Sequence, residues 1–235
     1  MSVAENIARV RERIQVASAQ AGRDAKEITL MGVSKTFPAE GIREAYQAGL
    51  RHFGENRVQE FAEKVDGLRD LGGAHWHMIG HLQTNKAARA AELFHAVDSV
   101  DSLKVAEKLN EAAGKAGKKL ALLIEVNVGG EAAKSGVAPG SPELARLLSA
   151  APQLEHLHVC GLMTVPPFME DPQAARPYFR RLRELRDQLA VRELPSVRME
   201  VLSMGMSHDF EVAILEGSTC VRVGTAIFGE RSPRA

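Results

Sequence analysis

Lys35 stands where an amine nucleophile is useful, because it directly follows the first apolar run of the sequence, residues 28–34. Solvent-poor surroundings disfavour the charged form of a lysine and lower its pKa, and a neutral amine can attack an aldehyde. A lysine at the end of a strand more commonly extends its charged group to water. Lys35 alone therefore leaves both interpretations open.

Two glycine-containing segments near the C-terminus have the composition of a phosphate site. Residues 203–207 read SMGMS, and residues 222–225 read RVGT. Glycine lets the backbone approach a ligand closely, serine and threonine hydroxyls donate to phosphate oxygens, and barrels commonly bind phosphate with the loops after strands seven and eight. The alternative is a pair of ordinary glycine turns with Ser207 as a helix N-cap. Asp209 and Glu211 make the following helix less favourable for an anion.

Arg222 lies in the last apolar run, on the opposite side of the expected strand from its neighbouring valines. By the alternation of side chains in a strand, Arg222 and Gly224 face one way and the two flanking valines face the other. If the valines pack against helices, the guanidinium points toward the mouth of a barrel. Such an arginine requires an acceptor, which is either a protein carboxylate or an atom of a ligand.

The histidines and cysteines do not have the spacing of a metal site. His77 and His81 are four residues apart, but Gly80 and the strand pattern do not place them on one helical face. We expect each to be a packed or hydrogen-bonded histidine. Cys160 and Cys220 each lie in an apolar run outside any Cys-x-x-Cys pair, which is typical of buried, reduced thiols in a cytosolic protein. No metal is expected.

Eight short apolar runs alternate with longer amphipathic stretches, as in parallel βα units. Because a closed barrel leaves no exposed sheet edge, we expect a single (β/α)8 TIM barrel over residues 28–229, within one domain of residues 1–235. A doubly wound open sheet is the alternative. The expected strands are 28–34, 52–55, 75–79, 93–97, 120–128, 157–163, 199–203 and 221–224. The expected helices between them include 39–48, 85–91, 102–116, 142–149, 173–190 and a short one over 208–216.

An additional helix is expected before the barrel, over residues 2–21. Ser2 and Glu5 form a capping-box pattern, and apolar residues then recur at helical spacing until Gly22. After the last strand only residues 228–235 remain, which is too few for an ordinary eighth helix. We expect the N-terminal helix to cover this gap.

The composition excludes several classes of partner. The chain has 235 residues, 45% of them hydrophobic, with 30 basic and 30 acidic side chains. The resulting net charge of zero argues against nucleic acid or an anionic membrane as the main partner. No apolar run is long enough to span a membrane, and the N-terminus lacks the pattern of a signal peptide. We therefore expect a cytoplasmic protein.

Six short motifs together are similar to those of one known family, and the similarity extends over essentially the whole chain. The most specific is the tract WHMIGHLQTNK of residues 76–86. With these motifs the chain resembles the pyridoxal 5′-phosphate (PLP) homeostasis proteins. The other five are VSKT (33–36), FGEN (53–56), GLMT (161–164), SMGMS (203–207) and RVGT (222–225).

The resemblance implies a barrel like the N-terminal domain of alanine racemase, with PLP bound as a Schiff base to Lys35. It further implies that Asn56 lies close to the cofactor and that Arg222 meets the pyridine nitrogen. The remaining cofactor-binding residues that it implies belong to the loops after strands seven and eight, which hold the phosphate. They are Ser203, Met206, Ser207, Gly224 and Thr225.

Two further positions concern the exchange of PLP. Phe37 stands where relatives often carry a second basic residue, so the resemblance gives no basis here for a role of that residue in receiving or releasing PLP. Lys134 matches another lysine of the family that could be a secondary acceptor of PLP. A solvated loop lysine is the interpretation that we favour for it.

The sequence favours a PLP carrier over an enzyme. Racemisation on PLP needs a base on each face of the substrate carbanion, usually a lysine and a tyrosine. Tyr46 and Tyr178 both fall in helical stretches, and no second domain follows the barrel to exclude water. Arg222 stays protonated and would donate to the pyridine nitrogen, which makes PLP a poorer electron sink. We expect a monomer that binds PLP and delivers it to apo-PLP enzymes, with no catalytic residues.

Two other functions remain open. A PLP-dependent amino-acid racemase would use His77 or His81 as the second base. A cofactor-free aldolase would form a Schiff base through Lys35, but it leaves the phosphate-type loops and Arg222 unexplained.

Overall fold

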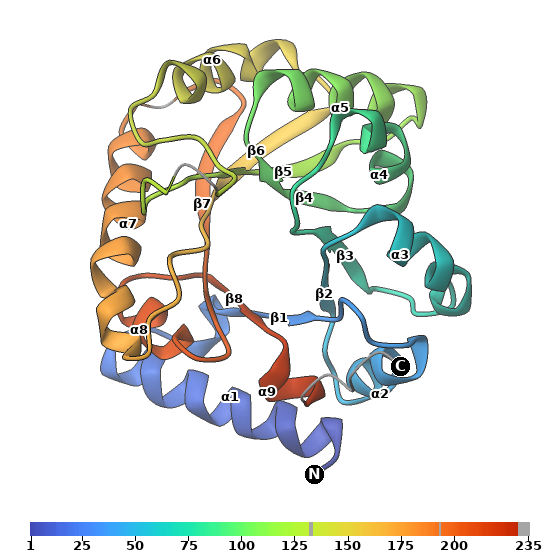
Figure 1. The fold of residues 1–235 in the computed structure, drawn as a ribbon, viewed down its shortest axis with the longest axis vertical. Coiled ribbons are helices and arrows are strands. Elements are labelled where there is room, and N and C mark those ends of the chain that lie inside the picture. Colours follow the sequence, from blue (N-terminus) through green and yellow to red (C-terminus); the bar gives the residue numbers. More distant parts are fainter. Residues whose placement is uncertain (132–133, 193, 230–235) are drawn as a thin grey trace.

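The computed structural model describes residues 1–131, 134–192 and 194–229, and its strands form a closed parallel barrel (Figure 1). The strands follow one another around the barrel in sequence order, and β1 closes the ring by pairing with β8. This confirms the (β/α)8 barrel and shows that the open sheet is wrong. The strands are β1 (Thr29–Val33), β2 (His52–Glu55), β3 (His75–Met78), β4 (Ala96–Val100), β5 (Leu120–Glu125), β6 (Leu157–Met163), β7 (Val197–Met206) and β8 (Cys220–Val223).

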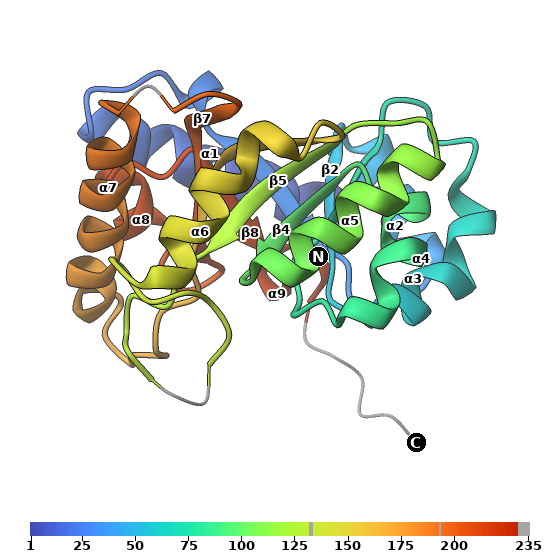
Figure 2. The same cartoon turned by 90° about the horizontal axis from the view of Figure 1, so that it is seen from above.

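Helices cover the outside of the barrel between successive strands (Figure 2). The helices expected from the sequence did not include α3 or α9, and α9 has only four residues. Among the described residues, no helix combines the length and the apolar character needed to cross a lipid bilayer. The helices are α1 (Val3–Gln20), α2 (Ala39–Gln47), α3 (Val58–Lys64), α4 (Ala87–Leu93), α5 (Leu103–Lys115), α6 (Pro142–Ala150), α7 (Arg176–Ala190), α8 (Phe210–Leu215) and α9 (Thr225–Phe228).

β4 lies three residues further along the chain than the sequence predicted, at Ala96–Val100 instead of 93–97. The helix before it continues to Leu93, and Phe94 is fully buried in the core. The strand itself carries Asp98 and Ser99, both buried. Polar residues are rarely buried, so a search for apolar residues does not recognise the half of the strand that contains Asp98 and Ser99. The predicted strand was therefore placed on the apolar residues that precede it.

The expected helix before the barrel is present as α1. Ser2 and Glu5 form its capping box, since Ser2 Oγ accepts from the Glu5 amide and the Glu5 carboxylate accepts from the Ser2 amide. The buried face of the helix includes Ile7, Val10 and Ile14. It packs against α8 and α9, in the place where the last βα unit has only a four-residue helix (Figure 1).

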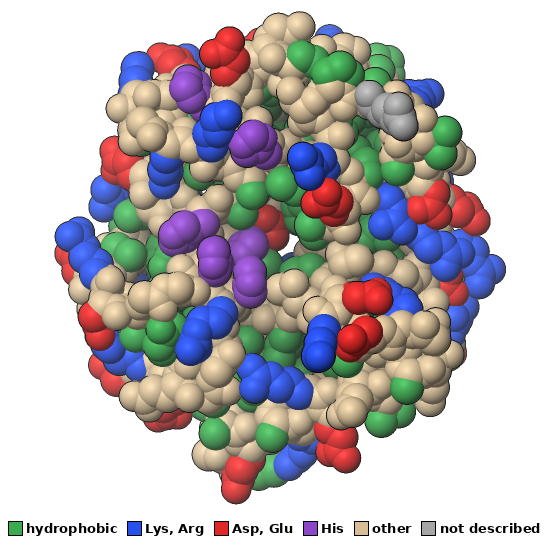
Figure 3. All heavy atoms as spheres, turned by 180° about the vertical axis from the view of Figure 1, so that it is seen from behind, with side chains coloured by type: hydrophobic (Ala, Val, Ile, Leu, Met, Phe, Trp, Pro, Cys, Tyr) green, Lys and Arg blue, Asp and Glu red, His purple; other side chains and the backbone are tan. Residues whose placement is uncertain are grey.

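The two ends of the barrel differ in chemistry. Figure 3 shows the end at which the strands begin, where several histidine side chains gather. Ring contacts join four of them, because His52 contacts His75 and His77, and His75 contacts His95. The opposite end, at which the strands terminate, holds the cavity described below.

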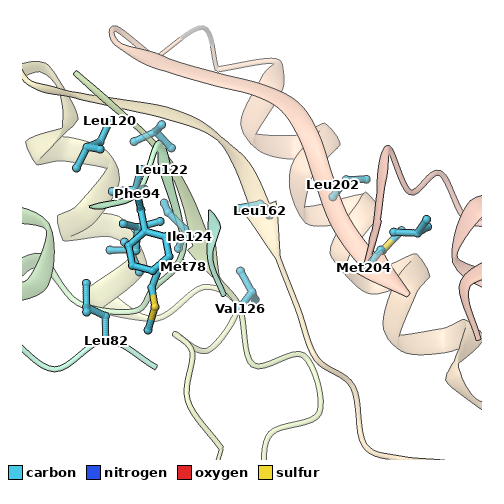
Figure 4. Packing of buried hydrophobic residues seen from close by; sticks show 14 of the residues in the cluster. Met78, Leu82, Phe94, Leu120, Leu122, Ile124, Val126, Leu162, Leu202 and Met204 are labelled. Carbon is cyan, nitrogen blue, oxygen red and sulfur yellow. The ribbon is translucent and has the colours of Figure 1, made fainter. Parts of the chain in front are cut away.

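The apolar core lies between the strands and the surrounding helices, and Figure 4 shows part of it. Alternate side chains of β5, such as Leu122 and Ile124, belong to this core. In β8 the core residues are Val221 and Val223, which leaves the intervening Arg222 on the barrel interior. The orientation predicted for Arg222 is therefore confirmed.

Candidate cofactor site

A cavity of about 380 Å³ opens at the end of the barrel where the strands terminate. Its walls come from the segments that follow β1, β2, β3, β6, β7 and β8. Seven of the eight residues expected to bind the cofactor line it, and the eighth, Ser203, contacts Arg222 instead. The seven are Lys35, Asn56, Met206, Ser207, Arg222, Gly224 and Thr225.

Arg222 brings a positive charge to the floor of this cavity. The residue is 3% exposed, and it donates from Nη1 to Ser203 Oγ (2.8 Å) and from Nη2 to the Thr164 carbonyl (2.7 Å). Burial lowers its pKa, whereas Cys220 and nearby carboxyl groups raise it. Both hydrogen bonds go to uncharged oxygen atoms, so they orient the guanidinium without neutralising it. A guanidinium has five N–H donors, so further donors remain for a ligand.

Ser207 connects the loop after β7 to the beginning of α9. Its Oγ accepts from the Gly224 amide (3.1 Å) and, less closely, from the Ala226 amide (3.4 Å). The N-cap of α8 is Asp209, so the alternative interpretation of Ser207 as a helix N-cap is wrong. The Ser207 and Thr225 hydroxyls line the cavity, together with the backbone of Gly224, whose N–H donates to Ser207. This set of donors fits a phosphate monoester.

The two carboxylates that counted against an anion have partners elsewhere. Asp209 is 7% exposed, and its Oδ1 accepts from the Met206 amide (2.6 Å) within its own loop. Glu211 pairs with Arg13 of α1 at 2.6 Å. Neither residue lines the cavity, although the charge of Asp209 is near enough to interact with Arg222.

Asn56 reaches the cavity because the loops after β2 and β3 pack closely against each other. A Cβ added to Gly80 would lie 2.3 Å from the Asn56 carbonyl oxygen, which no side chain can tolerate. Ser99 Oγ donates to the Gly80 carbonyl (2.6 Å) and holds the same segment from the side of β4. The glycine at position 80 therefore serves this close approach.

The remaining walls are largely apolar and were not predicted as a group. Phe37 lines the cavity, and its ring stacks on Phe228 at 5.0 Å. Val165 and Phe168, from the segment after β6, are 39% and 74% exposed beside the opening. The apolar residues 165–168, which follow the expected strand of residues 157–163, are the part of the sequence that could have indicated this wall. Apolar walls around polar donors suit a ring-bearing ligand.

The two histidines considered as second bases lie outside the cavity lining. His77 Nδ1 lies 3.2 Å from Asp98, and its Nε2 lies 3.0 Å from His52 Nδ1. His81 pairs with Asp101 at 3.2 Å. The prediction of a hydrogen-bonded histidine is confirmed for His77, whereas His81 is about half exposed beside Asp101. In the part of the chain that the structure describes, no three His, Cys, Asp or Glu residues are placed to hold a metal ion.

Lys134 lies in the loop after β5, where its Nζ is 2.9 Å from Glu131 Oε1. It does not line the cavity, and its side chain is 33% exposed. This geometry is that of a solvated loop ion pair. A secondary role as an acceptor of PLP stays an untested prediction.

Comparisons with known proteins agree with this architecture. The family model described as alanine racemase, N-terminal domain, matches residues 5–232. A pyridoxal phosphate homeostasis protein of Aquifex aeolicus is 50% identical, over 98% of this chain and 99% of its own, and that of Escherichia coli is 41% identical over 97% of each.

Among solved structures, PipY of Synechococcus elongatus with PLP bound is 38% identical, with a TM-score of 0.84 over 97% of this chain and 100% of its own. Alanine racemase from Streptomyces coelicolor is 22% identical with a TM-score of 0.70, and this chain covers 58% of it, which is a likeness of fold. The chain belongs to the pyridoxal phosphate homeostasis protein family and is built on the alanine racemase N-terminal domain.

Proposed function

We propose that this protein binds PLP in the cavity at the mouth of the barrel, as a Schiff base on Lys35, and delivers it to apo-PLP enzymes. The observation that carries the proposal is the convergence, around one cavity, of an amine, a phosphate-type donor set and a buried guanidinium. The names of the homologues and the PLP bound to PipY support PLP as the ligand.

Each part of the cavity suits one part of PLP. Bound PLP supplies an aldehyde, and the Lys35 amine is the group on this chain that would react with it. Ser207, Gly224 and Thr225 would hold the phosphate, with Met206 beside them. Arg222, oriented by Ser203, would donate to the pyridine nitrogen, and Asn56 would lie at the edge of the ring.

The same residues favour a carrier over a racemase. Tyr46 donates its hydroxyl to the Gly72 carbonyl and Tyr178 lies on α7, so neither lines the cavity as a second base. A permanently protonated Arg222 leaves the pyridine nitrogen unprotonated and weakens the electron sink that racemisation requires. We therefore propose that the protein has little or no catalytic activity and acts in PLP homeostasis.

The proposal includes a monomer in the cytoplasm. The thiols of Cys160 and Cys220 are free, which suits a reducing compartment. The Cys220 thiol is fully buried, and burial raises its pKa to about 12, so it is a structural thiol rather than a reactive one.

Borohydride reduction followed by mass spectrometry tests the covalent part. The reduced protein should carry a phosphopyridoxyl group on Lys35, and Lys35→Ala should lose the visible absorbance of the Schiff base. A label on Lys134 with Lys35 unmodified would contradict the assignment.

Transfer experiments test the carrier part. The PLP-loaded protein should activate an apo-PLP enzyme while a panel of amino acids stays unchanged in chirality. Turnover of any amino acid at about 1 per second or faster would favour the racemase instead.

A further inference from the structure

The turn that carries Lys35 is supported by a second lysine outside the cavity. Lys64 is the last residue of α3, and its side chain is 12% exposed. Its Nζ lies 3.0 Å from the Ser34 carbonyl oxygen, 3.3 Å from that of Phe37 and 2.8 Å from Glu55 Oε1. An ammonium group has three N–H donors, and these three acceptors match them.

Glu55 compensates the charge of this lysine in the interior. Its side chain is fully buried, and Oε1 also accepts from Ser34 Oγ at 2.5 Å. Burial raises the pKa of Glu55, while the charge of Lys64 and the hydrogen bonds of Lys64 and Ser34 lower it. Ser34 immediately precedes Lys35, so the pair fixes both the carbonyl and the hydroxyl of the residue before the reactive amine.

The turn needs such support because its backbone is unfavourable by itself. Thr36 has a φ of +67°, a left-handed conformation that β-branched residues rarely adopt. Its amide donates to the Glu60 carboxylate, which lies 3.6 Å from Lys64 Nζ. The Phe37 amide donates to the Ser34 carbonyl (3.1 Å) and closes the turn. Unfavourable backbone persists only where the surroundings over-determine it.

We infer that Lys64 is a positioning residue, which together with Glu55 fixes the backbone of residues 34–37 so that the Lys35 amine meets the aldehyde of PLP. The inference rests on the proposed function, since it concerns the placement of the amine that forms the Schiff base. Lys64 does not line the cavity, and its hydrogen bonds and ion pairs go to Ser34, Phe37, Glu55 and Glu60 rather than to the residues proposed to hold the phosphate and the pyridine nitrogen. Because its contacts hold the backbone on both sides of Lys35, we expect its main effect on the covalent step.

Two ligands separate this role from general support of the fold. PLP carries the aldehyde, whereas pyridoxine 5′-phosphate has a hydroxymethyl group there and cannot form a Schiff base. The double variant Lys64→Met with Glu55→Gln removes the ammonium donors without leaving a charged carboxylate buried. Its PLP affinity should fall about 10-fold or more, since hydrogen bonds to charged groups are lost. Its affinity for pyridoxine 5′-phosphate should stay that of the parent.

A second variant applies the same test with less risk to folding. Glu60 is partly exposed on α3, and Glu60→Ala removes the acceptor of the Thr36 amide. This variant should also lower the ratio of PLP affinity to pyridoxine 5′-phosphate affinity. The matched control is Lys108→Met, because Lys108 is an exposed lysine that pairs with Glu111 on α5. The control should bind both ligands as the parent does.

The outcomes are distinct. If the double variant and Glu60→Ala each lose affinity for PLP and for pyridoxine 5′-phosphate to the same extent, Lys64 supports only the fold. If both variants keep the PLP affinity of the parent, Lys64 does not position Lys35. Either result overturns the inference, and if the double variant does not fold, Glu60→Ala decides alone. Failure of the proposed function is recognised separately in the parent, which would then bind both ligands equally and carry no borohydride label on Lys35.

Discussion

Lys35 and Arg222 line the same cavity but, in our proposal, act on different atoms of PLP. Lys35 forms a covalent bond, whereas Arg222 donates a charge-assisted hydrogen bond. Arg222→Gln should therefore keep the borohydride label on Lys35 and weaken PLP binding about 10- to 100-fold, which corresponds to about 1.5–3 kcal/mol. Titrations followed by absorbance measure the loss, with Lys35→Ala as the opposite case, which loses the label but keeps phosphate contacts. Loss of the label in Arg222→Gln would contradict separate roles.

At the scale of single residues, the sequence predicted most of the residues that line the cavity, but it did not predict the pair of Lys64 and Glu55 that holds the turn of Lys35. Lys35, Asn56 and Arg222 stand at or near strand ends, and barrel geometry brings such positions to one mouth. Lys64 could not be found in this way, because it lies at the end of helix α3 and not at the end of a strand. Its contact with Glu55 follows from the packing of that helix and from no sequence motif.

At the scale of elements, the sequence located each strand, but the bounds of several strands differ from the prediction. β2 and β6 have the predicted bounds. β7 begins two residues earlier and ends three residues later than predicted. Arg198 and Glu200 are exposed around buried Met199 in its first half, whereas residues 202–205 are all buried and the pairing with β8 shifts register between Ser203 and Met206. Side chains of the barrel interior include polar groups such as Asp98, which single-sequence patterns treat as loop.

The N-terminal helix gives a prediction at the same scale. Val10 is 2% exposed on the buried face of α1, whereas Val16 is 54% exposed. Val10→Ala should lower the free energy of unfolding by about 2 kcal/mol, because buried methyl groups are lost and a cavity remains. Val16→Ala is the matched control and should change it by less than about 0.5 kcal/mol. Equal effects in urea unfolding would contradict the packing of α1 against the barrel.

On the scale of the whole molecule, titratable groups at the two ends of the barrel respond to pH in opposite directions. Burial raises the pKa of Glu125, at the end of β5, to about 7, and Asp101 adds to this. Burial lowers the pKa of His52, at the start of β2, to about 4, with further lowering by His77 and His75. The ordinary values are 4.5 and 6.5, so both groups titrate differently in the folded and unfolded chains.

The signs of the two contributions follow from proton binding. Between about pH 4.5 and pH 7 the folded chain keeps a proton on Glu125 that the unfolded chain releases, so stability from this group falls as the pH rises. Between about pH 4 and pH 6.5 the unfolded chain binds a proton at His52 that the folded chain does not, so stability from this group rises with pH. In the shared range the two slopes offset each other.

Replacing either group should therefore reveal the slope of the other. Glu125→Gln keeps the size of the side chain but cannot titrate, so its free energy of unfolding should fall more steeply than that of the parent as the pH is lowered from about 6.5 to 4.5. His52→Gln should show the opposite change over the same range. Glu111→Gln is the control, because Lys115 and Lys108 hold the pKa of Glu111 at about 2 in the folded chain, so this group affects the slope only as the pH approaches its ordinary value of 4.5. Urea unfolding at constant ionic strength measures all four proteins. Parallel pH profiles would show that Glu125 and His52 do not carry these opposing contributions.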